Sequence, residues 1–343
     1  MKNQNSGGQG IGLLPEAQAG LPPSRPAVAM TPVVIVGAGI AGLACARRLA
    51  QHGVAALLLD KGRTSGGRVA TRHVEGLQFD HGAQYVTART PAFAAVLDGL
   101  AARGAAAPWP NDAGLNRVVG TPGMSALGKA LAEGLDVRQG VEVGALRQGE
   151  GVWHVQAPDS LLLAGRVVVT VPAPQVAGLL GGDHPLVAQL LDVKMAPCLT
   201  LMAALRAHPP FVTHEAPDEP LAWIAQDSAK PGRSAVESGG ASAWVAQAGP
   251  AFSVEHLEES PAAIAARMLP LLCERLGVTM DHVTYAAAHR WRYARVIRPL
   301  GQPFLHDASG TLYLGGDWCI GPRVEAAWTS GTAIAEDLLA GMS

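Results

Sequence analysis

The sequence is short of charged and aromatic residues, which make up 16% and 5% of its 343 positions. Its 26 basic and 28 acidic residues nearly balance, so the chain offers no positive field of the kind that binds nucleic acid. The four cysteines stand singly, without a Cys-X-X-Cys pair or a histidine at metal-ligand spacing. We therefore expect reduced thiols, no metal site and no nucleic-acid partner, as is typical of a cytoplasmic protein.

The sequence also lacks a hydrophobic run that could cross a membrane. The most apolar stretch, residues 32–46, is shorter than the roughly 20 residues that a bilayer requires, and two arginines follow it directly. The N-terminal segment has no apolar core of the kind found in signal peptides. Residues 1–29 are rich in Gly, Pro and Gln without hydrophobic periodicity, so we expect a disordered tail there, with either Met1 or Met30 as the natural start.

Glycine is abundant, at 41 positions, in a chain that is 48% apolar. That hydrophobicity excludes a disordered protein, and the length suffices for two domains or one large α/β unit. A glycine content of about one residue in eight indicates either slack linkers or backbone that must approach a ligand closely. The positions of the glycines decide between these two readings.

A complete β-turn-α-β unit follows the tail. Residues 33–36 predict a buried strand, residues 40–52 a helix and residues 55–59 a second buried strand. Gly37-Ala-Gly39-Ile-Ala-Gly42 connects the first strand to the helix, which matches the glycine pattern that lets backbone reach a pyrophosphate at a helix N-terminus. Asp60 ends the second strand, where a carboxylate binds ribose hydroxyls. The unit predicts a dinucleotide site.

The remaining pattern predicts that this α/β domain is interrupted by a mostly antiparallel one. We expect helices over 91–104, 124–133, 261–276 and 324–339, a loop over 105–122, and strands over 137–146, 152–156, 166–171, 194–206, 222–225, 243–247, 283–289 and 312–315. The predicted fold class is α/β: a doubly wound Rossmann-type domain with an inserted, mostly antiparallel α+β domain. The first domain would comprise residues 30–90, 116–175 and 283–343, and the second, substrate-binding domain residues 91–115 and 176–282.

Two further glycine-rich segments fit a long, extended ligand. Gly66-Gly67-Arg68 lies just beyond Asp60, where a second stretch of backbone could wrap around a pyrophosphate. Gly315-Gly316-Asp317 follows a late strand, where a carboxylate could reach a ribityl hydroxyl, and the helix after it could face the pyrimidine edge of a flavin. Glycine sites so far apart in the sequence favour FAD over a shorter nucleotide.

With these motifs in view, the sequence resembles the renalase-like branch of the flavin amine-oxidase superfamily. The likeness extends over nearly all of residues 31–340 and rests on motifs in a matching order: DKGRTSGGRVATRH from Asp60, FDHGAQY from Phe79, GTPGMSALGKAL from Gly120, HRWRYA from His289, and GGDWCIGPRVEAAWTSG from Gly315. The resemblance implies non-covalent FAD on the Rossmann-type domain and a separate substrate domain over the flavin.

Carried over residue by residue, the resemblance implies a set of FAD contacts. These run from the pyrophosphate and adenosine ribose to the ribityl and pyrimidine end, and they are Gly37, Gly39, Ile40, Ala41, Gly42, Asp60, Lys61, Gly67, Arg68, Gln84, Val143, Gly316, Asp317, Glu325, Ala326 and Ala327. Lys61 and Arg68 would lie beside the phosphates, and Gln84 near the flavin. A covalent link through Cys319 is disfavoured, because its position does not match the pattern of covalent relatives.

The substrate side is less clearly specified. Candidate catalytic or substrate-contacting residues are Trp318, Gln247, Trp291, Tyr293 and His289, although core packing explains the aromatic residues equally well. Gln247 departs from the resemblance, since family members carry a histidine there. For His289 and for His81, a structural hydrogen bond is the stronger interpretation.

Three functions stay open at this point. The first is a renalase-like oxidase that converts misreduced dihydro-NAD(P) isomers to NAD(P)⁺ by hydride transfer to the flavin and passes electrons to O₂. The second is an oxidase of a small amine through the same step. The third is a flavin-binding redox sensor without catalysis. The sequence specifies neither the substrate nor the oligomeric state.

Overall fold

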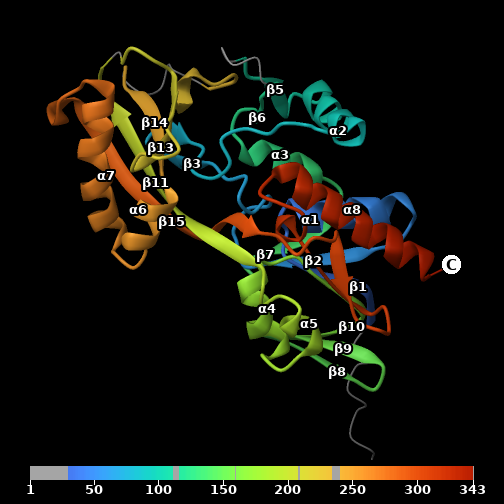
Figure 1. The fold of residues 1–343 in the computed structure, drawn as a ribbon. Helices are drawn as coiled ribbons and strands as arrows, with labels where there is room; N and C mark the ends of the chain where they lie inside the picture. Colours follow the sequence, from blue (N-terminus) through green and yellow to red (C-terminus); the bar gives the residue numbers. More distant parts are fainter. Residues whose placement is uncertain (1–29, 111–115, 159, 208, 234–239, 343) are drawn as a thin grey trace, which may run out of the picture.

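The computed structural model describes residues 30–110, 116–158, 160–207, 209–233 and 240–342. The tail expected over residues 1–29 lies outside them. Within the described residues the chain forms two large sheets, each covered by helices, and two small hairpins (Figure 1). None of the described helices is both long enough and apolar enough to cross a membrane.

An eight-stranded sheet carries the N-terminal βαβ unit. Its path runs β16-β17-β10-β1-β2-β7, and β9 and β8 extend from β10. Strands from β17 to β7 are parallel, whereas β16, β9 and β8 pair antiparallel. The strands are β1 (Met30–Val36), β2 (Ala56–Asp60), β7 (Asp136–Gln139), β8 (Ala145–Gly149), β9 (Val152–Ala157), β10 (Ser160–Val169), β16 (Phe304–His306) and β17 (Leu312–Gly315). This sheet confirms the predicted Rossmann-type fold.

Helices cover both faces of this sheet. Val33 and Ile35 of β1 enter one core, and Val34 and Val36 enter another on the opposite face. Burial on both faces explains why β1 is continuously apolar rather than alternating. The first core is closed by α1 (Ile40–Gln51), α2 (Pro91–Ala102), α3 (Ser125–Ala132) and α8 (Val324–Ala340), and the second by α4 (Ala173–Leu180) and α5 (Pro185–Ala188).

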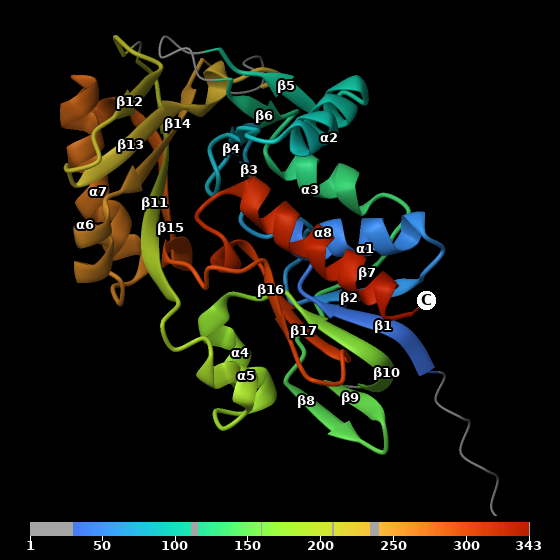
Figure 2. The ribbon, with the colours of Figure 1, turned by 45° about the vertical axis from the view of Figure 1, so that its right-hand side comes forward.

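Helices α1 and α8 lie side by side across the sheet (Figure 2). A Cβ atom at Gly331 of α8 would overlap the backbone of Ala41 in α1, so the close crossing requires glycine at this position. Arg47 of α1 donates to the carbonyl oxygens of Ala130 (3.0 Å) and Leu131 (2.8 Å) at the end of α3. These contacts fix the second half of α1 against the C-terminal end of α3.

A five-stranded antiparallel sheet, ordered β12-β13-β14-β11-β15, forms the second part of the molecule. Its strands are β11 (Lys194–Leu205), β12 (Thr213–Glu215), β13 (Leu221–Gln226), β14 (Ser242–Ala248) and β15 (Val283–Arg298). Helices α6 (Pro250–Glu255) and α7 (Pro261–Leu276) pack on one face. Helix α7 begins at Ser260, whose hydroxyl accepts from the Ala263 N–H at 3.2 Å, and ends at left-handed Gly277.

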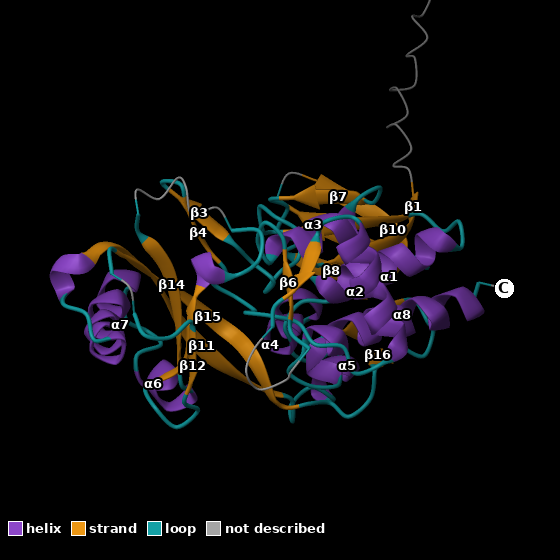
Figure 3. Cartoon of the chain, turned by 90° about the horizontal axis from the view of Figure 1, so that it is seen from above, coloured by secondary structure: helices purple, strands orange, loops and turns teal. Residues whose placement is uncertain are grey.

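Short elements connect the two large sheets. Strand β3 (Arg72–Val74) pairs with β4 (Leu77–Phe79), and β5 (Ala106–Pro108) pairs with β6 (Val118–Gly120). The short 3₁₀ helices are η1 (Asp227–Ala229), η2 (Met280–His282) and η3 (Asp317–Cys319). Figure 3 shows β11 and β15 leading from the antiparallel sheet towards the centre of the molecule.

The structure differs from the sequence predictions in several segments, and strand β10 begins six residues before the predicted start at 166. The expected loop over 105–122 contains the β5–β6 hairpin, which lacks a clear signal because both of its strands are short. The predicted strand over 137–146 is instead two strands, β7 and β8, interrupted after left-handed Gly140. Strand β15 continues nine residues beyond the predicted end at His289, because it pairs along the whole of β11.

In three places, strand pairing or helix packing crosses the domain boundaries expected from the sequence. The hairpin of β5 and β6 crosses the boundary set at 115/116. Helices α4 and α5 pack on the eight-stranded sheet, although most of their residues were assigned to the substrate domain. Strand β15, assigned to the FAD-binding domain, belongs to the antiparallel sheet. Because pairing and packing rather than sequence order decide these memberships, the division into domains stays a proposal.

Candidate cofactor and substrate site

The glycine turn between β1 and α1 exposes unpaired backbone donors. Gly37 has φ +108°, and a Cβ atom at Gly42 would overlap the carbonyl oxygen of Gly37. Gly39 is the N-cap residue of α1 and provides no side-chain cap. The Thr170 hydroxyl holds the turn by donating to the Gly37 carbonyl at 3.0 Å. The helix start therefore offers the N–H groups of its first turn, Ile40 and Ala41 among them, to an anion.

A second glycine segment lies directly against the first. The Gly66 N–H donates to the Ala38 carbonyl at 2.8 Å, and Gly39 and Gly66 form a parallel bridge. A Cβ atom at left-handed Gly67 would come within 3.3 Å of the Gly39 Cα. Two backbones without side chains thus meet at the start of α1, which leaves room for a pyrophosphate between main-chain donors.

Asp60 stands beside this turn. Its carboxylate accepts from the Ala38 N–H at 2.5 Å and from the Gly62 N–H at 2.6 Å, which fixes it at the carboxyl end of β2. Val143 is buried nearby, because the Val141 N–H donates to the backbone carbonyl of Asp60 and so holds this segment beside the end of β2. Lys61, in contrast, reaches Glu142 at 3.4 Å on the exposed surface, and its phosphate contact stays a prediction without support from this geometry.

The fold also brings Arg68 and Asp317 together across 249 residues. The guanidinium donates to both carboxylate oxygens of Asp317, at 2.9 and 2.5 Å, and to the Ala294 carbonyl at 2.8 Å. Gly316 is tied to α8 because its N–H donates to the Ser330 hydroxyl at 2.9 Å. This bidentate pair places one cation and one anion beside the two glycine segments.

The residues after Asp317 turn into the protein core. Trp318 is 1% exposed, packs on the face of the sheet that α4 covers, and donates to the Val171 carbonyl at 3.0 Å. The substrate platform expected of Trp318 is therefore not supported, because its ring faces core side chains. Cys319 is fully buried, and burial raises the pKa of its thiol to about 12. A thiol this difficult to ionise is a poor nucleophile.

The start of α8 is the second uncapped helix N-terminus at this place. Ala326 and Ala327 are buried there, and the N-cap residue Arg323 provides no side-chain cap. Glu325 accepts from the Arg89 N–H at 3.0 Å and from the Thr90 N–H at 2.8 Å. Burial opposes ionisation of Glu325, but these hydrogen bonds outweigh it and hold the pKa below its usual range. Glu325 thus fastens the α2 entry segment to α8.

The residues present fit FAD in their chemistry. Two uncapped helix starts, two adjacent glycine backbones and the Asp60 carboxylate are the donor and acceptor groups that a dinucleotide requires. The chain offers these groups without a bulky side chain at Gly39, where a Cβ atom would meet nothing within 4 Å. Individual contacts to the cofactor remain predictions.

A buried charge cluster that the sequence did not reveal lies between the two large sheets. Its members are Asp80, Asp227, Lys230 and Arg233, all with side chains at most 2% exposed. The Lys230 ammonium lies 2.5 Å from Asp227 and 3.3 Å from Asp80. It also donates to the amide oxygen of Gln84 at 3.2 Å. Gln84, predicted to approach the flavin, is therefore held in place by this cluster.

The cluster balances its own charge. Burial opposes ionisation of Asp80, but Lys230 and Arg233 outweigh it and keep the pKa of that carboxyl low. Burial raises the pKa of Asp227, and the nearby Asp80 adds to the rise. Arg233 pairs with Asp80 and donates to the Gly120 carbonyl at 2.7 Å. The cluster joins the loop after β4, η1 and the end of β6.

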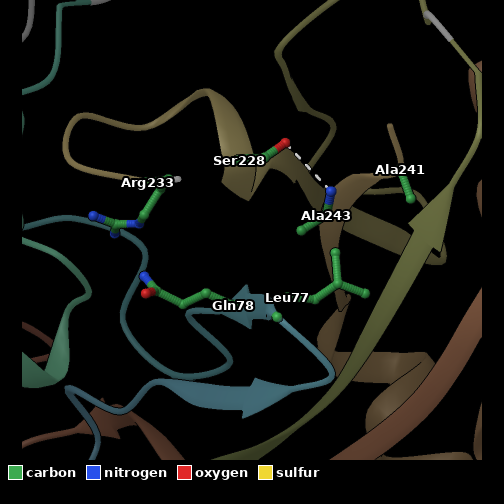
Figure 4. Close-up of a pocket in the computed structure, with 7 residues that line it drawn as sticks. Leu77, Gln78, Ser228, Arg233, Ala241 and Ala243 are labelled. Atoms are coloured by element: carbon green, nitrogen blue, oxygen red, sulfur yellow. Dashed lines mark hydrogen bonds between the residues drawn. The ribbon is translucent and has the colours of Figure 1, made fainter. Parts of the chain in front are cut away.

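A small crevice adjoins the cluster. Figure 4 shows Arg233 extending beside Gln78, while Ser228 accepts from the Ala243 N–H at 3.3 Å across the crevice. Its volume is only about 10 Å³, which is at the lower limit for a single water. This crevice therefore does not serve as a substrate site.

A row of side chains crosses the antiparallel sheet on the face turned away from α7. The strand register pairs Trp223 with Gln247, Gln247 with Thr200, and Thr200 with His289. Directly paired residues share one face of a sheet, so the four side chains line up across four strands. The Gln247 amide donates to the Gly82 carbonyl at 2.7 Å, which shows that this face meets the loop after β4. We call these four residues the cross-strand row.

Two imidazoles and an indole gather at one end of the cross-strand row. His81 and His289 pack edge to face with ring centroids 4.8 Å apart, and Trp291 lies 5.4 Å from His81 and 4.4 Å from His289. The Trp291 indole donates to the His81 carbonyl at 2.7 Å. Tyr293, two residues further along β15, is half-buried and lies where the register between β11 and β15 shifts.

Both imidazoles in this group are neutral at pH 7. Burial lowers the pKa of His81 to about 4, and the neighbouring His289 and Arg72 add to the effect. Burial likewise lowers the pKa of His289 to about 4, with Arg72 contributing. The rings at this end of the cross-strand row are therefore polar or aromatic and uncharged, with the Arg72 cation nearby.

Sequence reasoning missed Thr200, Trp223 and the buried charge cluster. Strand alternation in 194–206 could have assigned Thr200 to a buried position, because it is a polar residue in an apolar strand. Its alignment with Gln247 and His289 depends on register, which no local pattern reports. Asp227 and Lys230 lie in a segment without a recognisable motif.

Two family models match consecutive parts of the chain. Residues 35–100 match the NAD(P)-binding Rossmann-like domain, and residues 102–339 match the flavin containing amine oxidoreductase. Among curated proteins, lysine-specific histone demethylase 1 homolog 2 from Oryza sativa subsp. japonica is 46% identical over 57 residues. That match covers 17% of this chain and only 8% of the relative's length.

Solved structures resemble the chain over nearly its whole length. A protein from Exiguobacterium sp. 255-15 assigned as a protoporphyrinogen oxidase has a TM-score of 0.71 at 15% identity, covering 90% of this chain and 98% of that one. Putrescine oxidase bound to putrescine has a TM-score of 0.67 at 15% identity, covering 91% and 99%. At such identities the likeness shows a shared fold.

The family assignment rests on the second family model, which spans more than half of the chain and ends within the last helix. The first model covers the β-turn-α-β unit that carries the glycine turn and Asp60. The chain therefore belongs to the flavin-containing amine oxidoreductase family and is an oxidoreductase with FAD as its cofactor.

Proposed function

We propose that this enzyme is renalase-like and oxidises a dihydronicotinamide, with misreduced dihydro-NAD(P) isomers converted to NAD(P)⁺ and O₂ as the electron acceptor. The observation that carries the proposal is the uncharged, aromatic end of the cross-strand row, with His81, His289 and Trp291 in mutual contact. A planar, neutral dihydropyridine ring suits stacking on such a surface.

The proposed roles on the cofactor side follow from the geometry above. Gly37, Gly39 and Gly42 would hold the pyrophosphate at the start of α1, and Asp60 the adenosine ribose. Asp317 would hold the ribityl part, and Arg68, which pairs with it, would lie beside the phosphates. Bound FAD would supply a two-electron acceptor for the hydride equivalent of the substrate, with O₂ as the proposed final acceptor. The high thiol pKa of Cys319 supports non-covalent binding.

On the substrate side the chain acts by orientation rather than by strong acid–base chemistry. Trp291 would stack on the substrate ring, and its hydrogen bond to the His81 carbonyl keeps the indole in one orientation. Gln247 would present its amide oxygen to the substrate, since its amide nitrogen is engaged by Gly82. Oxidation of a dihydropyridine needs no proton acceptor, because restored aromaticity drives loss of the hydride equivalent.

A second candidate function is oxidation of a small amine, which the family assignment and the putrescine oxidase fold favour. Binding a protonated amine calls for carboxylates or an aromatic cage around the cation. The four residues of the cross-strand row include no acidic side chain. This difference in charge is the reason for ranking amine oxidation second.

One experiment separates the two candidates. The purified, FAD-loaded enzyme is mixed without oxygen with misreduced dihydro-NAD isomers, with ordinary NADH and with a panel of amines that includes putrescine, and bleaching of the flavin absorbance is followed. Rapid bleaching by the isomers alone supports the proposal, and bleaching by amines alone replaces it with the second candidate. Bleaching by none of them contradicts both.

A matched pair of variants tests the stacking surface. Trp291→Ala removes the indole that packs on His289 at the end of the cross-strand row, whereas Trp328→Phe changes an indole of α8 that packs on Phe93. We expect Trp291→Ala to raise the half-saturating substrate concentration about 10-fold, because one aromatic stacking contact is worth roughly 1 kcal/mol or more. Equal behaviour of the two variants would remove Trp291 from the substrate site.

A further inference from the structure

A buried cation lies at the opposite end of the cross-strand row. Arg117, directly before β6, is 5% exposed, and its guanidinium carbon lies 4.4 Å from the ring centroid of Tyr85, 5.0 Å from that of Trp223 and 5.9 Å from that of Trp109. Three aromatic residues therefore surround one guanidinium. Cation–π contacts of this kind hold the flat face of the group and leave its N–H edge for hydrogen bonds.

The charge on Arg117 is poorly compensated by the described residues. The nearest carboxylate, Glu215, lies 3.6 Å away, beyond hydrogen-bond distance, on a side chain that is 58% exposed. Arg117 Nε is buried and has no hydrogen-bond partner there, and the same holds for the indole Nε1 of Trp223 beside it. Two buried donors without acceptors are unfavourable, so this pair of side chains is suited to receive an acceptor from a ligand.

Arg117 and Trp223 lie at the end of the cross-strand row that is opposite His289. Trp223 is the cross-strand neighbour of Gln247, which in turn neighbours Thr200 and then His289. With about 4.8 Å between adjacent strands, Trp223 and His289 stand about 14 Å apart. The row thus has a cationic end at Arg117 and a neutral aromatic end at His289, separated by the length of a ligand larger than a single ring.

We propose that Arg117, together with the indole N–H of Trp223, binds an anionic group of the substrate, a phosphate or a carboxylate, and so selects substrates in which this group lies some distance from the oxidised ring. The inference rests on the proposed function for the identity of the ring. A guanidinium forms bidentate hydrogen bonds to phosphate and carboxylate, and the aromatic residues hold it in one plane for this purpose.

The same arrangement disfavours cationic substrates. A diamine lying along the row would bring a second positive charge to Arg117, and like charges in a partly desolvated site repel strongly. Lys230 adds a further ammonium 5.3 Å from the Trp109 ring, although Asp80 and Asp227 pair with it. Arg117 therefore acts as both an attractive element for anions and a repulsive element for amines.

The test compares two substrates that share a ring and differ in charge: the misreduced dihydro form of nicotinamide mononucleotide and that of nicotinamide riboside, which lacks the phosphate. Anaerobic bleaching of the flavin is measured against substrate concentration for the wild type, Arg117→Met and Trp223→Phe. The control is Arg298→Met, which removes an arginine that is 64% exposed and pairs with Asp192.

For the wild type we expect half-saturation at a concentration at least 10-fold lower for the phosphorylated substrate. Arg117→Met should raise that concentration about 10- to 100-fold and leave the riboside value unchanged, as expected for the loss of a charge-assisted hydrogen bond. Trp223→Phe keeps an aromatic ring and removes only the N–H donor, so we expect a smaller rise of about 3- to 10-fold. Arg298→Met should match the wild type.

A binding measurement keeps the inference separate from the proposed function. Oxidised nicotinamide mononucleotide, inorganic phosphate and acetate are titrated while the melting temperature is followed. Stabilisation by the first two, lost in Arg117→Met and in Trp223→Phe, supports a phosphate site, and stabilisation by acetate alone supports a carboxylate site. If no dihydronicotinamide bleaches the flavin, the proposed function fails, and this titration still decides the anion site.

The inference is overturned if the wild type treats both dihydronicotinamides alike and no anion raises its melting temperature. It is also overturned if Arg117→Met and Trp223→Phe retain the full preference for the phosphorylated substrate. If Arg117→Met does not fold, Trp223→Phe and Arg117→Lys are used to test the inference instead. Lysine keeps the charge without the bidentate geometry, so Arg117→Lys should retain part of the preference.

Discussion

The two sheets contribute to the site by different means. The eight-stranded sheet presents backbone: two glycine segments in a parallel bridge and two helix starts without side-chain caps. The antiparallel sheet presents side chains, which strand register arranges into the cross-strand row. A backbone site tolerates few changes in shape, whereas a row of side chains can be altered one residue at a time. We expect cofactor binding to be the more rigidly specified function.

The largest effect is expected at the buried charge cluster, which lies between the two large sheets. Lys230→Met would leave Asp80 and Asp227 buried without their shared cation, and removing one partner from a buried charge cluster is typically destabilising by about 3–5 kcal/mol. Urea unfolding at pH 7 measures the free energy of unfolding. The control is Lys194→Met, because Lys194 is exposed.

A restored charge balance sharpens this result. In Lys230→Met with Asp227→Asn, one cation and one anion are removed together, so we expect part of the lost stability to return. A Lys230→Met variant as stable as Lys194→Met would show that the buried charge cluster does not hold the two halves together.

The backbone site is tested at its tightest glycine. Gly42→Val would force side-chain atoms into the carbonyl of Gly37, so we expect FAD binding to weaken about 100-fold, equal to about 2.7 kcal/mol. Gly99→Ala is the control, since a Cβ atom at Gly99 in α2 meets nothing within 4 Å. The measurement is the FAD dissociation constant from flavin fluorescence. Normal FAD binding by Gly42→Val would contradict the close packing of the turn.

The ribose contact is expected to matter less. Asp60→Ala removes the carboxylate that accepts from Ala38 and Gly62, and with it a proposed partner for ribose hydroxyls. We expect FAD to bind about 10-fold more weakly, as for loss of a hydrogen bond to a charged group. Asp98→Ala, at an exposed position of α2, is the control. Unchanged FAD occupancy would exclude Asp60 from the ribose site.

The last effect appears only at acidic pH and concerns the neutral imidazoles. Folding lowers the pKa of His81 and His289 from the ordinary 6.5 to about 4, so between these values the unfolded chain binds more protons than the folded one. Their contribution to stability is therefore complete above pH 6.5 and declines as the pH falls towards 4. We expect the melting temperature to drop over this range, and to drop less steeply in His81→Gln.

The pH experiment has its own control. His52→Gln changes an exposed histidine at the end of α1 and should keep the slope of the wild type. Identical slopes in all three proteins would mean that His81 titrates in the folded state as it does in the unfolded chain.

More of the backbone site on the eight-stranded sheet than of the cross-strand row could be predicted from the sequence. Gly37, Gly39, Gly42 and Asp60 can be proposed from the sequence because a nucleotide-binding turn depends on local backbone conformation, which a short motif reports. The alignment of Gln247 with Thr200 was not found, because register is decided by pairing between distant segments. The role of Trp318 stays open at the level of sequence for a related reason, since the motif locates the residue but not the direction of its ring.

The dependence on contacts between distant segments also explains why the sequence did not reveal the interactions of the loop after β4. Asp80 lies in the FDHGAQY motif, yet its partners Lys230 and Arg233 come from a segment more than 140 residues away without a motif of its own. Arg117 lay in a stretch expected to be a loop, and only the β5–β6 hairpin brings it against Tyr85 and Trp223. Buried ion pairs of this kind need tertiary contacts to become visible.

Strand β15 has a mechanical consequence for substrate entry. Its 16 residues pair along β11 with three local register shifts, carry His289 and Trp291, and offer the Ala294 carbonyl to Arg68, the partner of Asp317. Just beyond its end, Leu300 and Gly301 donate to the carbonyls of Trp318 and Cys319. A paired ribbon fastened at both ends resists bending, so the two halves are poorly suited to open as a hinged clamshell. Substrate must then enter and leave through movements of side chains and short loops while the ribbon stays in place.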